Sequence, residues 1–129
     1  MAKYWFDHVH LVTKNPETTA GFYEKMFGAK RDGFLELPGG RTLVSVALDG
    51  ASIKTSQPRP EPLIPNTLPE GCGLEHFGLA TDNIEEALAE LKASGVKCVL
   101  EVTEISPTTK IAYVVSPENI LIELMGYSN

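Results

Sequence analysis

Cysteine is scarce in this chain of 129 residues, which contains only Cys72 and Cys98 and no C-x-x-C pair. This scarcity argues against a disulfide framework. The sequence also lacks an apolar run of about 18 residues, the length that a membrane-spanning helix requires. The N-terminal stretch MAKYWFDHVH has no apolar segment typical of a signal peptide. We therefore expect a cytoplasmic protein without a membrane partner.

Basic residues are also few, because 11 Lys and Arg stand against 17 Asp and Glu, which gives a net charge of −6. They are scattered along the sequence rather than clustered, so we expect no nucleic-acid partner. Apolar residues make up 43% of the chain and charged residues 22%, ordinary values for a globular protein with a core. The length fits one compact domain or two fused half-domains of about 60 residues each.

An internal repeat organises the sequence. Residues 7–15, DHVHLVTKN, reappear as residues 75–83, EHFGLATDN, with the His, Leu, Thr and Asn identical at an offset of 68 residues. Similar segments follow at almost the same offset, GAK at 28–30 and GVK at 95–97. The matching order of these segments indicates two related halves.

Each half predicts a strand, a helix and three further short strands. Apolar and β-favouring residues without proline predict the leading strands at 4–13 and 74–81. Cap residues and apolar positions at helical spacing predict the helices, which end at Gly28 and Gly95. The other expected strands are 30–37, 41–48 and 51–57 in the first half, and 97–105, 109–115 and 119–126 in the second. This predicts a first module at 1–57, a proline-rich linker at 58–72 and a second module at 73–129.

Two histidines hold equivalent places in the repeat, since His8 and His76 each follow a carboxylate in the leading strand. Packing of related halves about a pseudo-twofold axis would bring the two side chains together, as metal ligands or as a paired structural site. Glu123 lies in an apolar stretch, where a carboxylate is costly to bury unless it is paired or bound to a metal; a solvated strand face is the alternative. Two imidazoles and one carboxylate suit a divalent ion of iron, manganese, nickel, cobalt or zinc, with positions left open for water or substrate.

These residues carry a resemblance to a known family. The Asp-His strand, the helix end EKMFG at 24–28 and the segment SPENILIEL at 116–124 resemble the vicinal oxygen chelate superfamily. That group includes glyoxalase I, methylmalonyl-CoA epimerase, fosfomycin-resistance proteins, bleomycin-binding proteins and extradiol dioxygenases. The resemblance implies an α+β fold of two paired βαβββ modules, with mixed sheets that curl into a cup around the metal. It also implies a homodimer and the ligand set His8, His76 and Glu123.

The activity that the resemblance favours is that of a divalent-metal-dependent lyase or isomerase acting on a small oxygenated organic substrate through metal chelation and proton transfer. Glyoxalase I and the epimerases use a fourth ligand on the last strand of the first module. The repeat offset places that position at Lys54 or Thr55, neither of which is a carboxylate, and Gln57 comes two or three residues late. A three-ligand site therefore stays close to an extradiol-type ferrous dioxygenase as well. A metal-free small-molecule-binding protein of the drug-resistance type is a further alternative.

Two more residues are candidates for catalysis. His10 points to the same side of its strand as His8, about 6–7 Å further along, and suits an acid or base beside a metal-bound substrate or a hydrogen-bonded residue of the barrel wall. Tyr113 precedes Glu123 by ten residues, a spacing similar to that of the active-site tyrosine in extradiol enzymes. The aromatic residues Tyr4, Trp5 and Phe6 are expected in the core or in a dimer contact.

Overall fold

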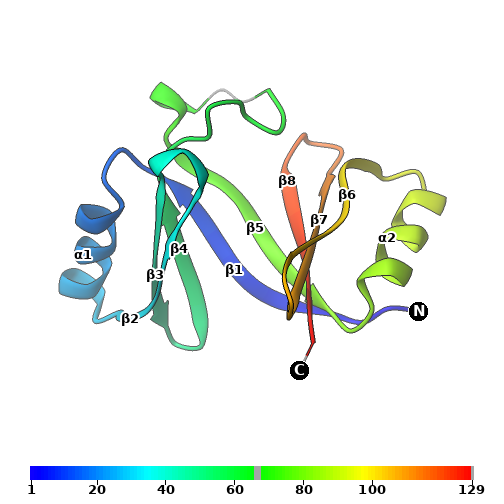
Figure 1. Ribbon diagram of the computed structural model, residues 1–129, viewed down its shortest axis with the longest axis horizontal. Helices are drawn as coiled ribbons and strands as arrows, with labels where there is room; N and C mark the ends of the chain where they lie inside the picture. The colour runs from blue at the N-terminus through cyan, green and yellow to red at the C-terminus, as the bar shows by residue number, and fades with distance from the viewer. Residues whose placement is uncertain (66–67, 129) are drawn as a thin grey trace. The chain divides into compact units, whose positions relative to one another are not determined.

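The structure is a computed structural model that describes residues 1–65 and 68–128. Asn66 and Thr67 of the predicted linker, and Asn129, lie outside the described residues. The described residues form an α+β fold of two βαβββ modules, which confirms the predicted fold class. The elements in chain order are β1 (Tyr4–Val12), α1 (Pro16–Phe27), β2 (Lys30–Glu36), β3 (Thr42–Leu48), β4 (Ala51–Ser56), β5 (Gly73–Thr81), α2 (Ile84–Ala93), β6 (Lys97–Ser106), β7 (Thr109–Val115) and β8 (Leu121–Tyr127) (Figure 1).

The chain divides into two compact units, which we name by the chain end that dominates each. The N-terminal unit is His8–Glu75, and the C-terminal unit comprises Met1–Asp7 together with His76–Asn129. The division falls inside β1 and inside β5, so the first residues of β1 belong to the C-terminal unit.

The N-terminal unit has the strand order β2-β3-β4-β1, with β1 parallel to β4 and the other pairs antiparallel. Helix α1 covers one face of this sheet, where Ala20 packs with Val44 and Val46 in the buried core (Figure 1). Side chains alternate along a strand, so the residues between the valines face the other way. His10 pairs in register with Lys54, which places both side chains on the face opposite α1.

Helix α1 begins and ends as the sequence predicts. The Asn15 side chain accepts a hydrogen bond from the Thr18 N–H, and Pro16 occupies the first turn, where no N–H is needed. Gly28 ends the helix with a φ of +77°, in the left-handed region that favours glycine. Helix α2 has the equivalent Asn83 cap but ends at Ala93, two residues before the predicted stop at Gly95.

The C-terminal unit contains the strand order β5-β8-β7-β6, with β5 parallel to β8 and the other pairs antiparallel. Helix α2 covers one face, and its Ile84 and Leu88 pack against Ala112, Val114 and Leu124. Because Glu123 and Tyr113 neighbour these core residues and pair in register, they lie on the opposite face of the sheet.

Residues 1–7 are fastened to the rest of the C-terminal unit by hydrogen bonds. The Ala2 N–H donates to Glu90 Oε1 at 2.9 Å, and the Lys3 N–H donates to Asp82 Oδ1 at 3.0 Å. The Tyr127 hydroxyl donates to Asp7 Oδ1 at 3.0 Å. The N-terminal segment is therefore an integral part of this unit.

Tyr4, Trp5 and Phe6 are expected in the core or in a dimer contact, and the first of these two expectations is wrong. Their exposed fractions are 38%, 52% and 55%. Their expected role in a dimer contact stays a prediction. Among the described helices, none has the length and apolar character that a membrane span requires.

Candidate functional site

His76 and Glu123 form a buried pair of an imidazole and a carboxylate in the C-terminal unit. The parallel pairing of β5 and β8 places Glu123 beside Gly78, two residues from His76 on the same face. His76 Nε2 lies 3.1 Å from Glu123 Oε1, and the two residues are only 1% and 8% exposed. A buried carboxylate needs a partner of this kind, since an isolated buried charge is costly.

The distance between these two atoms also fits shared coordination of one ion. Two ligand atoms that are each about 2.1 Å from a metal and subtend a right angle there lie about 3.0 Å apart. The observed 3.1 Å therefore fits either a direct hydrogen bond or two adjacent ligand atoms. If the contact is a hydrogen bond, the tautomer of His76 decides whether Nε2 is its donor or its acceptor. The donor set is thus compatible with a divalent ion.

Tyr113 completes this face of the C-terminal unit. Its ring meets the His76 ring edge-on, with centroids 5.4 Å apart and an interplanar angle of 89°. Tyr113 is buried and pairs in register with Glu123 across β7 and β8. The contact restricts rotation of the imidazole, so Tyr113 acts on the His76–Glu123 pair through packing.

The N-terminal unit contributes two buried histidines from one strand. His8 and His10 lie on the same face of β1, with ring centroids 6.4 Å apart. His10 Nε2 is 2.7 Å from the Ser56 hydroxyl, and the Arg41 guanidinium donates a hydrogen bond to the same oxygen at 3.4 Å. The serine therefore connects a titratable imidazole to a permanent positive charge.

The strand registers identify the residue that stands where a fourth ligand would be. In the C-terminal unit Gly78, two residues after His76, pairs with Glu123. In the N-terminal unit His10, two residues after His8, pairs with Lys54. Lys54 is therefore the register equivalent of Glu123, which resolves the two positions that the sequence offset allows. A lysine cannot ligate a metal while it is charged.

Gln57, the other residue that could replace the fourth ligand, uses its side chain for hydrogen bonds to Thr42. Its side-chain oxygen accepts a hydrogen bond from the Thr42 N–H at 2.7 Å, and its amide donates to the Thr42 hydroxyl at 3.2 Å. These bonds hold Gln57 between the edges of β3 and β4. The N-terminal unit therefore offers His8 and His10 as donors among the residues of its candidate face that the structure describes.

Sequence reasoning did not find Ser56 or Arg41. Neither residue has a counterpart in the repeat, and the hydrogen bond from Ser56 to His10 depends on a register that only the folded sheet reveals. Of the candidate residues named from the sequence, His8 and His10 lie in the N-terminal unit, and His76, Glu123 and Tyr113 lie in the C-terminal unit. All three histidines are buried, and imidazoles of this kind can hold a metal ion.

Tyr127 lies on the same strand face as Glu123 and has a perturbed acidity. Burial, and then the neighbouring Asp7 carboxylate, raise the pKa of the Tyr127 hydroxyl above its usual range. The phenol therefore stays protonated at neutral pH and donates to Asp7.

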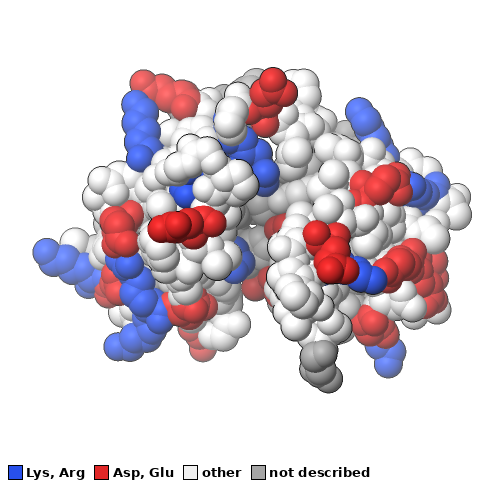
Figure 2. All heavy atoms as spheres, in the orientation of Figure 1, with Lys and Arg blue, Asp and Glu red and all other residues white. Residues whose placement is uncertain are grey.

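Charged side chains on the surface are intermixed. On the face shown in Figure 2, basic and acidic residues alternate on each unit and form no continuous basic patch. Exposed ion pairs account for several of them, among them Arg31 with Glu17 and Lys110 with Glu85. Such pairs contribute little to stability because water screens them.

The model of the glyoxalase/bleomycin resistance protein/dioxygenase superfamily matches residues 5–124. The uncharacterized protein YaeR of Escherichia coli (strain K12) is 34% identical over 58 residues, a match that spans 43% of this chain and 43% of that protein. The match thus covers less than half of that relative.

Solved structures share the fold along nearly the whole chain. The hypothetical protein BH1468 from Bacillus halodurans C-125 has a TM-score of 0.79 and 19% identity, covering 98% of this chain and 96% of its own. Methylmalonyl-CoA epimerase from Mycobacterium tuberculosis has a TM-score of 0.76 and 18% identity, covering 96% of this chain and 88% of its own. At these identities the likeness concerns the fold.

Proposed function

Because the chain belongs to the glyoxalase/bleomycin resistance protein/dioxygenase superfamily, we propose that it is a divalent-metal-dependent lyase or isomerase acting on a small oxygenated organic substrate. The observation that carries the proposal is the buried pair of His76 and Glu123, with the two donor atoms 3.1 Å apart. The repeat-equivalent His8 is also fully buried, which suits a ligand shielded from bulk water.

The residues proposed to hold the ion are His8, His76 and Glu123. Two imidazoles and a carboxylate suit iron, manganese, nickel, cobalt or zinc, and three protein ligands leave positions for substrate. When bound, such an ion supplies a Lewis acid that polarises a carbonyl and stabilises negative charge on its oxygen. Catalysis by proton transfer also requires a base from the protein, and the N-terminal unit offers one.

His10 is the proposed proton carrier. Ser56 holds its Nε2 at 2.7 Å, which fixes the ring, and the imidazole titrates near neutral pH in its unperturbed form. His10 lies two residues from His8 on the same face of β1, which suits a base that acts beside a metal ligand but does not itself bind the metal. Tyr113 is proposed to position His76 through the edge-on ring contact.

Lys54 narrows the proposed substrate class. A cation replaces the carboxylate at the register position of the fourth ligand, on the same face as His10. This exchange favours a substrate that brings its own negative charge, such as a compound with a carboxylate on the carbon that exchanges its proton beside a carbonyl group. One solved epimerase of similar fold is in complex with methylmalonyl-CoA, which carries such a carboxylate and serves as a probe.

The decisive experiment combines metal analysis with proton exchange. Protein purified without added metal is expected to contain about one divalent ion per chain, and His76→Ala is expected to lose it. In deuterium oxide, the reconstituted protein is expected to exchange the C2 proton of methylmalonyl-CoA, with His10→Ala slowed by about 10²-fold or more. Metal-free protein, or His76→Ala with unchanged metal content, would refute the proposed site.

A ferrous dioxygenase is the second candidate, and the donor set favours it specifically. Two histidines and one carboxylate are the ligands of non-haem iron oxygenases. Oxygen consumption with catechol after anaerobic loading with Fe²⁺, and no proton exchange with manganese or zinc, would favour this activity. A metal-free binding protein is the third alternative, and it predicts ligand binding that His8→Ala and His76→Ala leave unchanged.

We also propose that the chain forms a homodimer. Trp5 and Phe6 are more than half exposed on β1, and large apolar side chains of this kind favour an interface. Light scattering at micromolar concentration is expected to give twice the chain mass, and Trp5→Glu is expected to return the monomer. A monomeric wild-type protein under these conditions would rule the dimer out.

A further inference from the structure

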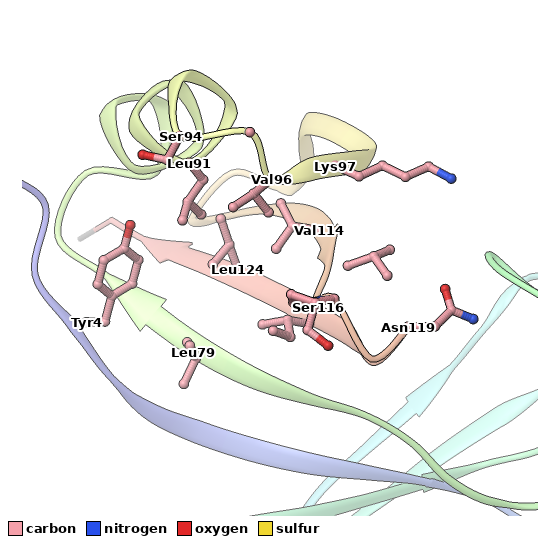
Figure 3. Close-up of a pocket in the computed structure, with 14 residues that line it drawn as sticks. Tyr4, Leu79, Leu91, Ser94, Val96, Lys97, Val114, Ser116, Asn119 and Leu124 are labelled. Atoms are coloured by element: carbon pink, nitrogen blue, oxygen red, sulfur yellow. The ribbon is translucent and has the colours of Figure 1, made fainter.

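The C-terminal unit contains a second candidate binding site that is separate from the proposed metal ligands. A cavity of about 660 Å³ lies between the end of α2 and the sheet of this unit (Figure 3). Its wall is formed by Leu79, Leu91, Val96, Val114, Ile122 and Leu124. Leu124 and Glu123 are adjacent in β8, so they point to opposite faces and the cavity lies on the helix side. This volume is in the range of pockets that accept drug-sized molecules.

Polar side chains are few in the lining of this cavity, which includes Tyr4, Ser94, Lys97, Ser116 and Asn119. Figure 3 shows Tyr4 at one end and Asn119 at the other, with aliphatic side chains between them, and Lys97 extends outward on the Asn119 side. Leu79, Leu91, Val96 and Ile122 pack against the core cluster and remain only partly buried, so apolar surface is left open to the cavity. A ligand that fills it gains free energy from covering this surface.

The two ends differ in charge, which gives a ligand an orientation. At the Tyr4 end, the carboxylates of Glu86 and Glu90 pair with the terminal ammonium of Met1 at 3.3 and 3.8 Å, so charges of both signs lie there and largely offset one another. At the other end, no carboxylate in the described ranges forms an ion pair with the Lys97 ammonium. An anion is therefore attracted to the Lys97 end of the cavity.

The cationic end also has a defined shape. The turn between β7 and β8 is fixed by hydrogen bonds from the Asn119 N–H to the Ser116 carbonyl at 2.9 Å and from the Ile120 N–H to the Ser116 hydroxyl at 3.1 Å. Asn119 has a φ of +64°, a conformation that asparagine tolerates better than most residues. A preformed rim needs little ordering when a ligand binds.

We propose that this cavity binds a medium-chain carboxylic acid, with the alkyl chain among the leucines and valines and the carboxylate at Lys97 and Asn119. The site is distinct from the proposed metal ligands, because it opens on the other face of the sheet. Its occupation does not depend on the proposed catalytic function.

Decanoate, below its micelle concentration, is the probe for a calorimetric titration of the full chain. Octanoate is expected to bind about 15-fold more weakly, since each methylene that leaves the cavity weakens binding about fourfold. Lys97→Glu is expected to weaken decanoate binding about three- to tenfold and to leave decanol binding unchanged. Lys25→Glu, an exposed substitution on α1 with the same charge change, is expected to leave both unchanged.

Val96→Trp should fill the cavity and abolish binding, whereas Leu35→Trp, at an exposed strand position of the other unit, should not. Because Lys97→Glu changes an exposed side chain, it keeps the test valid where Val96→Trp fails to fold. Removal of metal with a chelator, or Glu123→Gln, is expected to leave decanoate binding intact. No binding up to millimolar decanoate, equal effects of Lys97→Glu and Lys25→Glu, or binding that disappears with the metal would overturn the proposal.

Discussion

Glu123→Gln tests the proposed metal ligands with little change of shape. The amide occupies nearly the same volume as the carboxylate and can still hydrogen-bond to His76 Nε2, which lies 3.1 Å from Glu123 Oε1. What the substitution removes is one negative charge and a strong oxygen ligand in a buried environment, since Glu123 is 8% exposed. Metal affinity should therefore fall far more than the stability of the metal-free protein.

The size of the effect can be worked out from binding linkage. A metal present at 100 times its dissociation constant adds about 2.7 kcal/mol to the free energy of unfolding. For a chain of this length, 1 kcal/mol corresponds to about 3–5 °C in Tm, so the wild-type protein should gain about 8–13 °C. If Glu123→Gln weakens binding about 100-fold, the gain at the same metal concentration falls to about 0.4 kcal/mol, or about 1–2 °C.

Differential scanning fluorimetry with and without Zn²⁺, Mn²⁺ and Ni²⁺ measures this shift, starting from chelator-treated protein. Glu104→Gln is the matched control, because it removes the same charge from an exposed position of β6 and should keep the full wild-type shift. A Glu123→Gln protein that gains as many degrees from metal as the wild type would show that this carboxylate is not a ligand.

Three further substitutions test other parts of the structure. Gly126→Ala would place a Cβ 3.0 Å from two side-chain atoms of Ile84 in α2. It should therefore lower the free energy of unfolding, measured by urea titration, by about 1–3 kcal/mol. Gly33→Ala is the control, because its Cβ would meet its nearest neighbour at 3.5 Å and the change should be nearly neutral. Lys54→Glu places a carboxylate at the register equivalent of the third ligand and should tighten metal binding at least about tenfold in a chelator competition, and unchanged affinity would count against the equivalence. The pKa of Tyr127 is raised in the folded protein, so its contribution to stability is complete below pH 10, the usual pKa, and is lost as the pH rises further. Tyr127→Phe should therefore lose less stability than the wild type between pH 9 and 11. Parallel curves of stability against pH for the two proteins would contradict the raised pKa.

Much of the fold could be predicted because helix caps, turn residues and the internal repeat can be recognised in the sequence itself. Asn15 and Gly28 are the caps of the first helix, and the ends of the predicted strands agree with the observed ones to within two residues. His8 and His76 stand out because the repeat aligns them. Each of these inferences needs only sequence neighbours or an offset.

Other features depend on register and packing, which the sequence does not encode locally. The contact between His10 and Ser56 exists because β1 pairs with β4 in one particular register, and a slip of one residue would turn the serine to the other face. Tyr4 was expected in the core or a dimer contact, yet it lies at the end of a cavity whose existence depends on how side chains fill the space under α2. Lys54 is recognised as the equivalent of Glu123 only when the register of β1 with β4 is compared with that of β5 with β8.

The attachment of residues 1–7 to the C-terminal unit has a consequence for how the protein is made. The hydrogen bond from Tyr127 to Asp7 joins residues 120 positions apart, so during synthesis Asp7 has no access to this partner until Tyr127 has left the ribosome. The N-terminal unit can assemble earlier, from contiguous residues. The unit that carries His76 and Glu123 is thus the last to close.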